Sequence, residues 1–359
     1  MKNQSLILKL LVIAEVVMAI SSCTIIDDYL QNLDSDIKED AVNSGNQNNS
    51  DENPQDEPED SENESDDSQF IFKNINLNGT VSVSASFSAK ASSSARLYVA
   101  LPLPESNLYQ EISLENTGGA IDTTRMGNKF IYWDKTYSSG DNVNLNCEYQ
   151  IEYETYSVRV DLTKIKEIYP YDTESDVYKQ NIGSSGDYIV PTHPDIISIA
   201  SSLWDDSKDI LDYAKNCYEY TAANYQYLNP NTGLHKLDKN LQNGGGDCGN
   251  LSAIYISLLR NRNIPARPVV CIRPDGSFHV WSEFYLESYG WIPVDVTYKN
   301  SDREGNYFGV YSGDCIVVSN EYYVQMTAED RVFQTPLLQT YAYWYWNMSS
   351  MRHSYSIEE

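Results

Sequence analysis

The stretch GGGDCGNLSAIYISLLR, from Gly244 to Arg260, joins a run of glycines to an amphipathic segment, with one cysteine between them. Asp247 can cap a helix whose first turn contains Cys248. The helix should end near Asn261, because Pro265 cannot continue it. Apolar side chains recur along it at helical spacing and predict one buried face: Leu251, Ile254, Tyr255, Leu258 and Leu259.

This position gives Cys248 two possible roles, a buried structural thiol or a nucleophile. The free N–H groups and the positive dipole end of a helix N-terminus favour a thiolate and can stabilise an oxyanion. The glycines before Cys248 would let a substrate chain approach the backbone closely. Asp247 acts in the opposite direction, because a neighbouring negative charge raises the pKa of a thiol. A nucleophile also needs a base.

The chain offers few histidines as a base: His193, His235, His279 and His353. His279 lies in GSFHVWSEFYL, an alternating strand, and the next strand, GWIPVDVT, brings Asp295. If the two strands pair about Glu287, His279 faces Asp295, and the carboxylate would fix the tautomer of the imidazole and favour its charged form. A tight turn at residues 288–289 would instead place the two side chains on opposite faces.

Four sequence features of this region resemble the transglutaminase-like superfamily. They are the Gly-x-Cys helix start, the Ile-Pro-Ala-Arg turn, the His-x-Trp strand and the Gly-Trp-x-Pro-x-Asp strand. The resemblance covers about Tyr188 to Tyr345 and implies a papain-like α+β core, in which a cysteine helix packs on an antiparallel sheet. It also implies that Cys248 is the nucleophile, His279 the general base and Asp295 the residue that orients it. Proteases, amidases, transamidases and members without known activity share this triad.

The donor that would stabilise an oxyanion is left open by the sequence. Gln242 lies six residues before Cys248, a spacing similar to that of papain-type proteases, and Tyr225 is a second candidate. Gln242 could equally be an ordinary polar residue of a loop. We find no metal or cofactor motif, so we expect the site to need neither.

The N-terminus is typical of an exported lipoprotein. Residues 1–22 combine Lys2 with an interrupted apolar run that ends in AISSC, and Cys23 stands where the lipobox cysteine of bacterial lipoproteins is acylated. The lipid bilayer is therefore an expected partner, with the chain anchored to the cell membrane or the outer membrane. A plain secretory signal and a weak anchor helix are the alternatives.

Residues 23–69 are predicted to be a disordered acidic linker. Residues 24–69 hold 16 acidic side chains and one lysine, and these account for most of the net charge of −27. Such a segment cannot bury enough apolar surface to offset the entropy of ordering. The mildly acidic remainder lacks a basic face, so we expect no nucleic acid partner.

The rest of the chain predicts an α+β protein with two domains. Residues 70–172 alternate in short strands rich in Tyr, Val and Ile, which indicates an antiparallel β-sandwich. Residues 186–347 form the transglutaminase-like core, which begins with two helices that separate near residues 205–207. If Cys23 is acylated, five cysteines remain, and an odd number leaves at least one thiol unpaired.

Two classes of function follow. The first is a surface-tethered cysteine hydrolase or transamidase that acts on amide bonds of a protein, a peptide or cell-envelope material through a thioester at Cys248. The second is a non-catalytic module that retains the fold and binds peptides or glycans. Its cleft, or the aromatic segment QTYAYWYWNM (Gln339–Met348), would make the contacts, although such clusters are more often core.

The predicted lipid anchor can be tested directly. A Cys23→Ser variant should lose its membrane fraction, because the acyl chains attach to that sulfur. Fractionation of cells that express the wild type and the variant measures the change. Unchanged membrane retention would show that the apolar segment itself is the anchor.

Overall fold

The computed structural model describes residues 70–359 apart from 207–208, 229–232, 303 and 329–330. The predicted signal peptide, residues 1–22, and the predicted linker, residues 23–69, therefore lie outside the described residues. Within the described residues, no helix has the length and hydropathy that crossing a membrane requires.

The N-terminal part is antiparallel β-structure, as expected. Long strands dominate it because Val, Tyr and small side chains alternate over many residues, which suits a half-buried pleated surface. Its strands are β1 (Ile71–Pro102), β2 (Gln110–Thr117), β3 (Ala120–Thr123), β4 (Lys129–Tyr137) and β5 (Asn142–Val160).

These strands are hydrogen-bonded in one sheet rather than in the two sheets of the predicted sandwich. In the described part of the chain the sheet is seven-stranded, in the order β11-β5-β1-β4-β3, with β15 on β1 and β2 on β5. Residues at the two ends of β1 have different partners, because Ile71 pairs with β5 and Pro102 pairs with β4. A strand this long can therefore serve several neighbours within one sheet.

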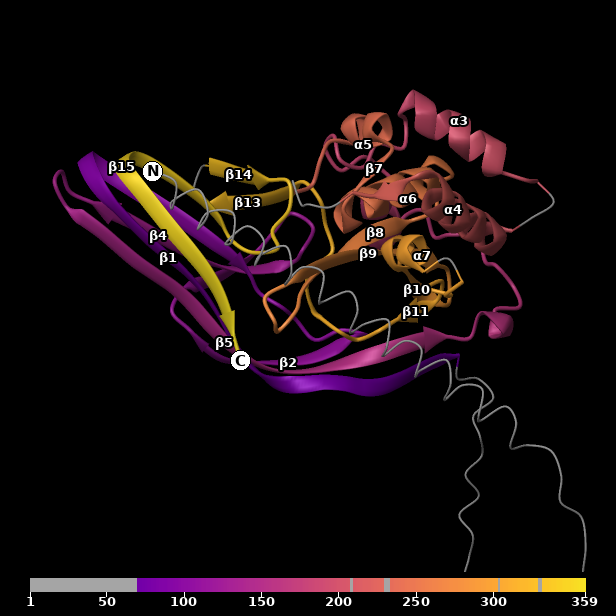
Figure 1. Cartoon of the computed structure of the whole chain (residues 1–359), viewed down its shortest axis with the longest axis horizontal. Coiled ribbons are helices and arrows are strands. Elements are labelled where there is room, and N and C mark those ends of the chain that lie inside the picture. Colours follow the sequence, from indigo (N-terminus) through magenta and orange to yellow (C-terminus); the bar gives the residue numbers. More distant parts are fainter. Residues whose placement is uncertain (1–69, 207–208, 229–232, 303, 329–330) are drawn as a thin grey trace, which may run out of the picture. The chain divides into compact units, whose positions relative to one another are not determined.

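The C-terminal strand completes this sheet. Strand β15 (Ala342–Glu358) pairs antiparallel with β1 and lies along it in Figure 1. Strand β11 (Val310–Tyr311) pairs with β5. The predicted core extended to residue 347. From Ala342 onward, however, the backbone is hydrogen-bonded to β1 of the N-terminal sheet. Pairing over such sequence distances is invisible to local patterns.

The second part carries the helices and a four-stranded antiparallel sheet in the order β10-β9-β8-β12. The sheet consists of β8 (Ala266–Ile272), β9 (Phe278–Leu286), β10 (Gly290–Val294) and β12 (Ile316–Ser319). The helices are η1 (Leu162–Lys164), α2 (Asp176–Asn181), α3 (Pro194–Leu203), α4 (Ile210–Asn224), α5 (Leu237–Asn243), α6 (Cys248–Asn261) and α7 (Val296–Ser301). The remaining short strands are β6 (Gln226–Tyr227), β7 (Gly245–Gly246), β13 (Val324–Ala328) and β14 (Arg331–Thr335). The α+β class is confirmed, and so is the separation of two helices near residues 205–207.

Helix α6 is buried on all sides, not only along its predicted apolar face. It contacts β8 and β9 and is also surrounded by α3, α4, α5 and α7, as Figure 1 shows. The five predicted face residues are fully buried, but Ser252, Ala253, Ile256 and Ser257 are buried as well. The Ser257 hydroxyl donates to the Ala253 carbonyl at 2.7 Å, so its burial leaves no unpaired donor. The second buried face carries small and polar side chains, so the spacing of apolar residues in the sequence did not predict it.

The two parts share a buried boundary built on β9. The Tyr109 hydroxyl, just before β2, donates to the Glu283 carboxylate, which also accepts from Arg267 Nε at 2.7 Å. An apolar cluster joins them: Tyr109, Tyr156, Val158, Val269, Cys271, Trp281, Tyr311, Cys315 and Val317. The sheet that carries His279 therefore rests on the N-terminal sheet, which limits its freedom to move.

The aromatic segment QTYAYWYWNM is divided between two faces of β15. Trp344 and Trp346 pack against the buried cluster around Tyr98 and Phe333. The tyrosines of the segment form a row of stacked rings, with centroid separations of 6.0 Å for Tyr341–Tyr343 and 6.1 Å for Tyr343–Tyr345. Tyr345 is 44% exposed. The tryptophans thus pack on the core while staying half-buried, and in this segment Tyr345 is the most exposed aromatic side chain.

The dependence of the fold on α6 can be measured by truncating one of its buried side chains. Ile254→Ala should lower the free energy of unfolding by about 2–5 kcal/mol, because Ile254 is 0% exposed and its loss leaves a cavity. Ile197→Ala on α3 is the matched control, since Ile197 is 45% exposed and should cost well under about 1 kcal/mol. Denaturant titration followed by circular dichroism compares the two. Equal losses would contradict the central place of α6.

Candidate active site

Helix α6 begins as the sequence predicts, with Asp247 as its N-cap and Cys248 in its first turn. The Asp247 carboxylate accepts from the Asn250 N–H at 3.2 Å and from the Asn250 side-chain amide at 2.7 Å. The side-chain oxygen of Asn250, Oδ1, in turn accepts from the backbone N–H of His235 at 2.8 Å. From the other side, the Tyr322 hydroxyl donates to the Gly249 carbonyl at 2.9 Å. The position of Cys248 is therefore set by contacts on both sides of the helix start.

The space beside Gly245 and Gly246 is occupied by the chain's own atoms, which differs from the prediction that the glycines before Cys248 admit a substrate chain. Gly245 has φ of 142° and pairs with Gln226 in the short parallel ladder of β6 and β7. A Cβ atom at Gly245 would lie 2.0 Å from the Gln226 carbonyl oxygen. One at Gly246 would lie 2.5 Å from the Asn250 Cβ. Glycine is required here for packing around the helix start.

Strands β9 and β10 bring His279 and Asp295 together, although the register differs from the predicted one. Trp291 pairs with Tyr285 and Val294 with Ser282, so the hairpin is centred on Ser288 rather than on Glu287. The hairpin is still centred on a residue, as predicted, and not between two residues, so the side chains of His279 and Asp295 stay on one face. Asp295 follows β10 directly, and its Oδ2 lies 2.6 Å from His279 Nε2.

Asp295 is also the N-cap of α7, which holds its carboxylate in place. Its Oδ1 accepts from the Thr297 N–H at 2.9 Å and from the Tyr298 N–H at 3.0 Å, while Oδ2 contacts His279. Two backbone donors thus orient the group that orients the imidazole. Both side chains are buried, so little water competes for these bonds.

The pKa of His279 reflects this environment. Burial of the imidazole lowers its pKa, but the charge and the hydrogen bond of Asp295, followed by the hydrogen bond and the charge of Cys248, outweigh burial and raise the pKa to about 10. Because Nε2 is bonded to Asp295, the contact with Cys248 falls to Nδ1, the other ring nitrogen. The charge on His279 therefore stabilises the folded state fully below about pH 6.5, and this stabilisation is lost as the pH rises through about 10.

Among the described residues, three cysteines are free, and only Cys248 is partly exposed. Cys147 and Cys217 are buried, and burial raises the pKa of each of these two thiols to about 12, which keeps them protonated. Cys271 and Cys315 form a disulfide between β8 and the segment before β12. The reactive candidate and the structural cysteines are thus clearly separated by their environments.

The two candidate oxyanion donors, Gln242 and Tyr225, have other surroundings in the structure. The Gln242 side chain is exposed and donates to Asp238 Oδ2 at 2.7 Å, within α5. Tyr225 is the C-cap of α4, and burial, followed by the charges of Tyr220 and Asp195, raises the pKa of its phenol to about 12. The backbone N–H of Cys248, at the first position of α6, is one of the donors that a helix N-terminus leaves without an intrahelical acceptor.

One residue of the site was not found from the sequence. The ring of Tyr298 stacks on the His279 imidazole, with 4.9 Å between centroids and 13° between planes. Tyr298 lies three residues after Asp295, in the first turn of α7. The only sequence signal was an aromatic residue three positions after Asp295, and such a spacing is too common to single out Tyr298.

The electrostatic role of Asp295 can be read from the titration of His279. Asp295→Asn keeps a side-chain oxygen for the cap but removes the charge, so burial should dominate and lower the imidazole pKa by about two units or more. NMR spectra of the histidine side chains across pH 5–11 measure this. Wild-type His279 should still be charged at pH 8. An imidazole that titrates near 6.5 in both proteins would contradict the pairing.

Residues 197–296 match the family model described as the transglutaminase-like superfamily. We found no match among curated proteins. A structure from Cytophaga hutchinsonii, named as a candidate cysteine protease, shares the fold with a TM-score of 0.53 at 12% identity, over 80% of this chain and 93% of that one.

The periplasmic domain of TgpA from Pseudomonas aeruginosa has a TM-score of 0.33 at 16% identity, over 60% of this chain and 74% of that one. The family match contains Cys248, His279 and Asp295, the residues that the structure brings together. The described chain therefore carries a transglutaminase-like superfamily domain.

Proposed function

We propose that this protein is a cysteine enzyme that cleaves or exchanges amide bonds of a peptide or protein substrate through a thioester at Cys248. The observation that carries the proposal is the contact of Cys248 with an imidazole whose other nitrogen is held by Asp295 at 2.6 Å. A thiol beside a charged imidazole at a helix N-terminus is suited to nucleophilic attack.

In the first half of the reaction, the Cys248 thiolate attacks the carbonyl carbon of the substrate amide. The negative charge that develops on the carbonyl oxygen is stabilised by the Cys248 N–H and the helix dipole. As the tetrahedral intermediate collapses, the C–N bond breaks and the His279 imidazolium gives its Nδ1 proton to the leaving amine. The products are a thioester on Cys248 and a free amine.

In the second half, water or a primary amine attacks the thioester carbonyl. Neutral His279 accepts a proton from this nucleophile at Nδ1, and Cys248 leaves as a thiolate. Water gives a carboxylic acid, which is hydrolysis, and an amine gives a new amide, which is transamidation. Asp295 keeps its hydrogen bond to Nε2 through both halves and holds the imidazole in the required tautomer.

A binding module without catalysis explains the site less well. Binding alone does not require a buried carboxylate, an imidazole and a partly exposed thiol in contact, and an ion pair of this kind is demanding to bury. The tyrosine row on β15 is a separate surface that could contact a substrate without taking part in the chemistry. The acylated Cys23 would hold the enzyme at a membrane, where it could act on proteins of the cell envelope.

The thiol chemistry is tested by the rate of Cys248 alkylation with iodoacetamide as a function of pH. Wild-type Cys248 should react rapidly at pH 6–7, where a free thiol with a pKa of about 8.5 is largely protonated. His279→Ala should move the profile to higher pH, because the neighbouring cation is lost, and Asp295→Ala should have a smaller effect. Cys147→Ala is the matched control, since Cys147 is buried in the N-terminal sheet. Identical free-thiol profiles for wild type and His279→Ala would overturn the proposal.

Turnover is tested with fluorescein-labelled casein, with and without dansylcadaverine as an amine acceptor. Release of soluble fluorescence indicates hydrolysis, and dansyl incorporation indicates transamidation. Cys248→Ala should lower either signal by at least about a thousandfold while the circular dichroism spectrum stays unchanged. A residual rate equal to that of the wild type would show that the activity does not depend on this thiol.

A further inference from the structure

The imidazole of His279 is fixed in position by Asp295 at one nitrogen and also has an aromatic ring against its face. Tyr298 stacks on it at 4.9 Å and 13°, whereas Trp281 lies at 6.1 Å and 24°. A ring parallel to the imidazole limits rotation about the bond to Cβ, which the hydrogen bond to Asp295 alone does not prevent. The face of a phenol ring also attracts a cation, so the stack favours the charged imidazole.

The Tyr298 ring can do this only if it is itself immobile, and its hydroxyl is held by two charged groups. The hydroxyl donates to Asp314 Oδ2 at 3.0 Å and accepts from Arg273 Nη2 at 2.8 Å. Arg273 and Asp314 are joined to each other, with Nε and Nη2 of the guanidinium at 2.8 and 2.7 Å from Asp314 Oδ2. We call Arg273, Tyr298 and Asp314 the imidazole clamp.

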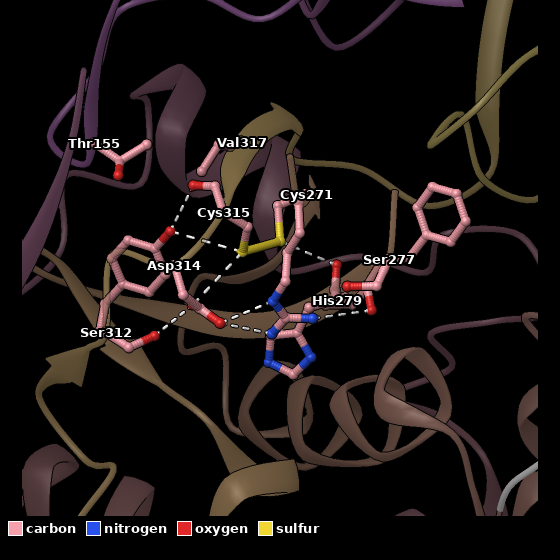
Figure 2. Close-up of a disulfide and its surroundings, with 12 residues drawn as sticks. Thr155, Cys271, Ser277, His279, Ser312, Asp314, Cys315 and Val317 are labelled. Atoms are coloured by element: carbon pink, nitrogen blue, oxygen red, sulfur yellow. Dashed lines mark hydrogen bonds and ion pairs between the residues drawn. A yellow bond between two sulfur atoms is a disulfide. The ribbon is translucent and has the colours of Figure 1, made fainter. Parts of the chain in front are cut away.

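The clamp is assembled from three separate elements. Arg273 follows β8, Tyr298 lies on α7 and Asp314 precedes β12. The Cys271–Cys315 disulfide fastens the segment of Asp314 to β8, and Cys271 is the cross-strand partner of His279. Figure 2 shows His279, Asp314 and the disulfide gathered in one place. The disulfide thus ties Cys315, the neighbour of Asp314, to Cys271, which lies two residues before Arg273 and opposite His279.

The charges of the clamp agree with those of the candidate site. Burial raises the pKa of Asp314, but the charges of Arg273 and His279 and the hydrogen bonds from Ser312 and Arg273 outweigh it, so the pKa falls to about 2. Asp314 is therefore ionised at neutral pH and adds to the field of Asp295 at the imidazole. Several titratable or charged groups of the described residues face His279. Cys248 comes from α6, and Asp295 and Tyr298 come from the start of α7. Arg273 follows β8, and Asp314 precedes Cys315.

We propose that Tyr298, anchored by the Arg273–Asp314 pair, is a positioning residue that holds the His279 imidazole in the plane from which Nδ1 meets Cys248 and favours its charged form. The inference rests on the proposed thiol chemistry for its catalytic consequence, although the positioning of the imidazole can be measured without any reaction. Arg273 and Asp314 act through Tyr298 and do not touch the reacting atoms.

The test compares Tyr298→Leu, which removes the ring, with Tyr298→Phe, which keeps the ring and loses the hydroxyl. Tyr298→Leu should lower the His279 pKa by about one unit and slow the alkylation of Cys248 by iodoacetamide at pH 7 by about tenfold. Tyr298→Phe should leave the His279 pKa nearly unchanged and slow the alkylation of Cys248 about threefold, because the ring remains but is no longer anchored. Asp314→Asn keeps a side-chain oxygen for the Tyr298 hydroxyl but removes a negative charge that faces the imidazole, so it should also lower the His279 pKa.

The matched control is Tyr213→Leu, which also truncates a buried tyrosine whose hydroxyl is bonded to a neighbour, here the Leu258 carbonyl at 2.9 Å. It should destabilise the protein as Tyr298→Leu does and leave the His279 titration unchanged. Thermal unfolding of all variants separates loss of fold from loss of position. The His279 signal is identified by its absence from His279→Gln, which is practical because the chain has four histidines.

The NMR titration is repeated in a Cys248→Ser background, so it does not depend on the thiol. If wild-type Cys248 reacts like a free thiol, the proposed function fails, while the shift of the His279 pKa in Tyr298→Leu still decides the positioning role. If both Tyr298→Leu and Asp314→Asn leave the His279 pKa and the alkylation rate within twofold of wild type, the clamp has no such role.

Discussion

The structure depends on the complete burial of α6, the helix that begins at Cys248. Its contacts on all sides fix its axis, and an N-cap and a tyrosine hydroxyl fix its first turn. A helix held in this way is partly exposed only at its two end residues, Cys248 and Asn261, and the N-terminal one carries the thiol. The same burial that stabilises the core therefore places a dipole end and free N–H groups at the site.

The opposite wall of the site is held by a different set of constraints. Strand β9 carries His279 on one edge of a buried boundary that runs through Glu283, Arg267 and Tyr109 to the N-terminal sheet. The N-terminal sheet is thus part of the support of the site and not only a neighbouring domain. Strand β15 belongs to this same sheet. Along the sequence, the helical core therefore lies between two segments that pair in one sheet.

The site combines an ion pair, a cap and an aromatic stack in a small volume. Asp295 serves as a partner of His279 and as the cap of α7, and the same helix supplies Tyr298 to the imidazole face. A side chain with two structural duties is harder to displace than one with a single bond. This economy explains how a buried imidazole, which burial alone would keep neutral, can retain its charge.

The sequence by itself determined the α+β class, the limits of α6, the cap at Asp247 and the joint membership of Cys248, His279 and Asp295 in one site. The first three depend on local periodicity and capping chemistry, whereas the joint site was implied by the resemblance to the transglutaminase-like superfamily, with hairpin parity supporting the His279–Asp295 pair. Only the tertiary structure decided the single N-terminal sheet, the return of β15, the hairpin centre at Ser288, the use of Gly245 and Gly246 for packing, and the clamp around Tyr298. The physical reason is that these features arise from contacts between segments far apart in the chain, where each residue alone has an ordinary local pattern.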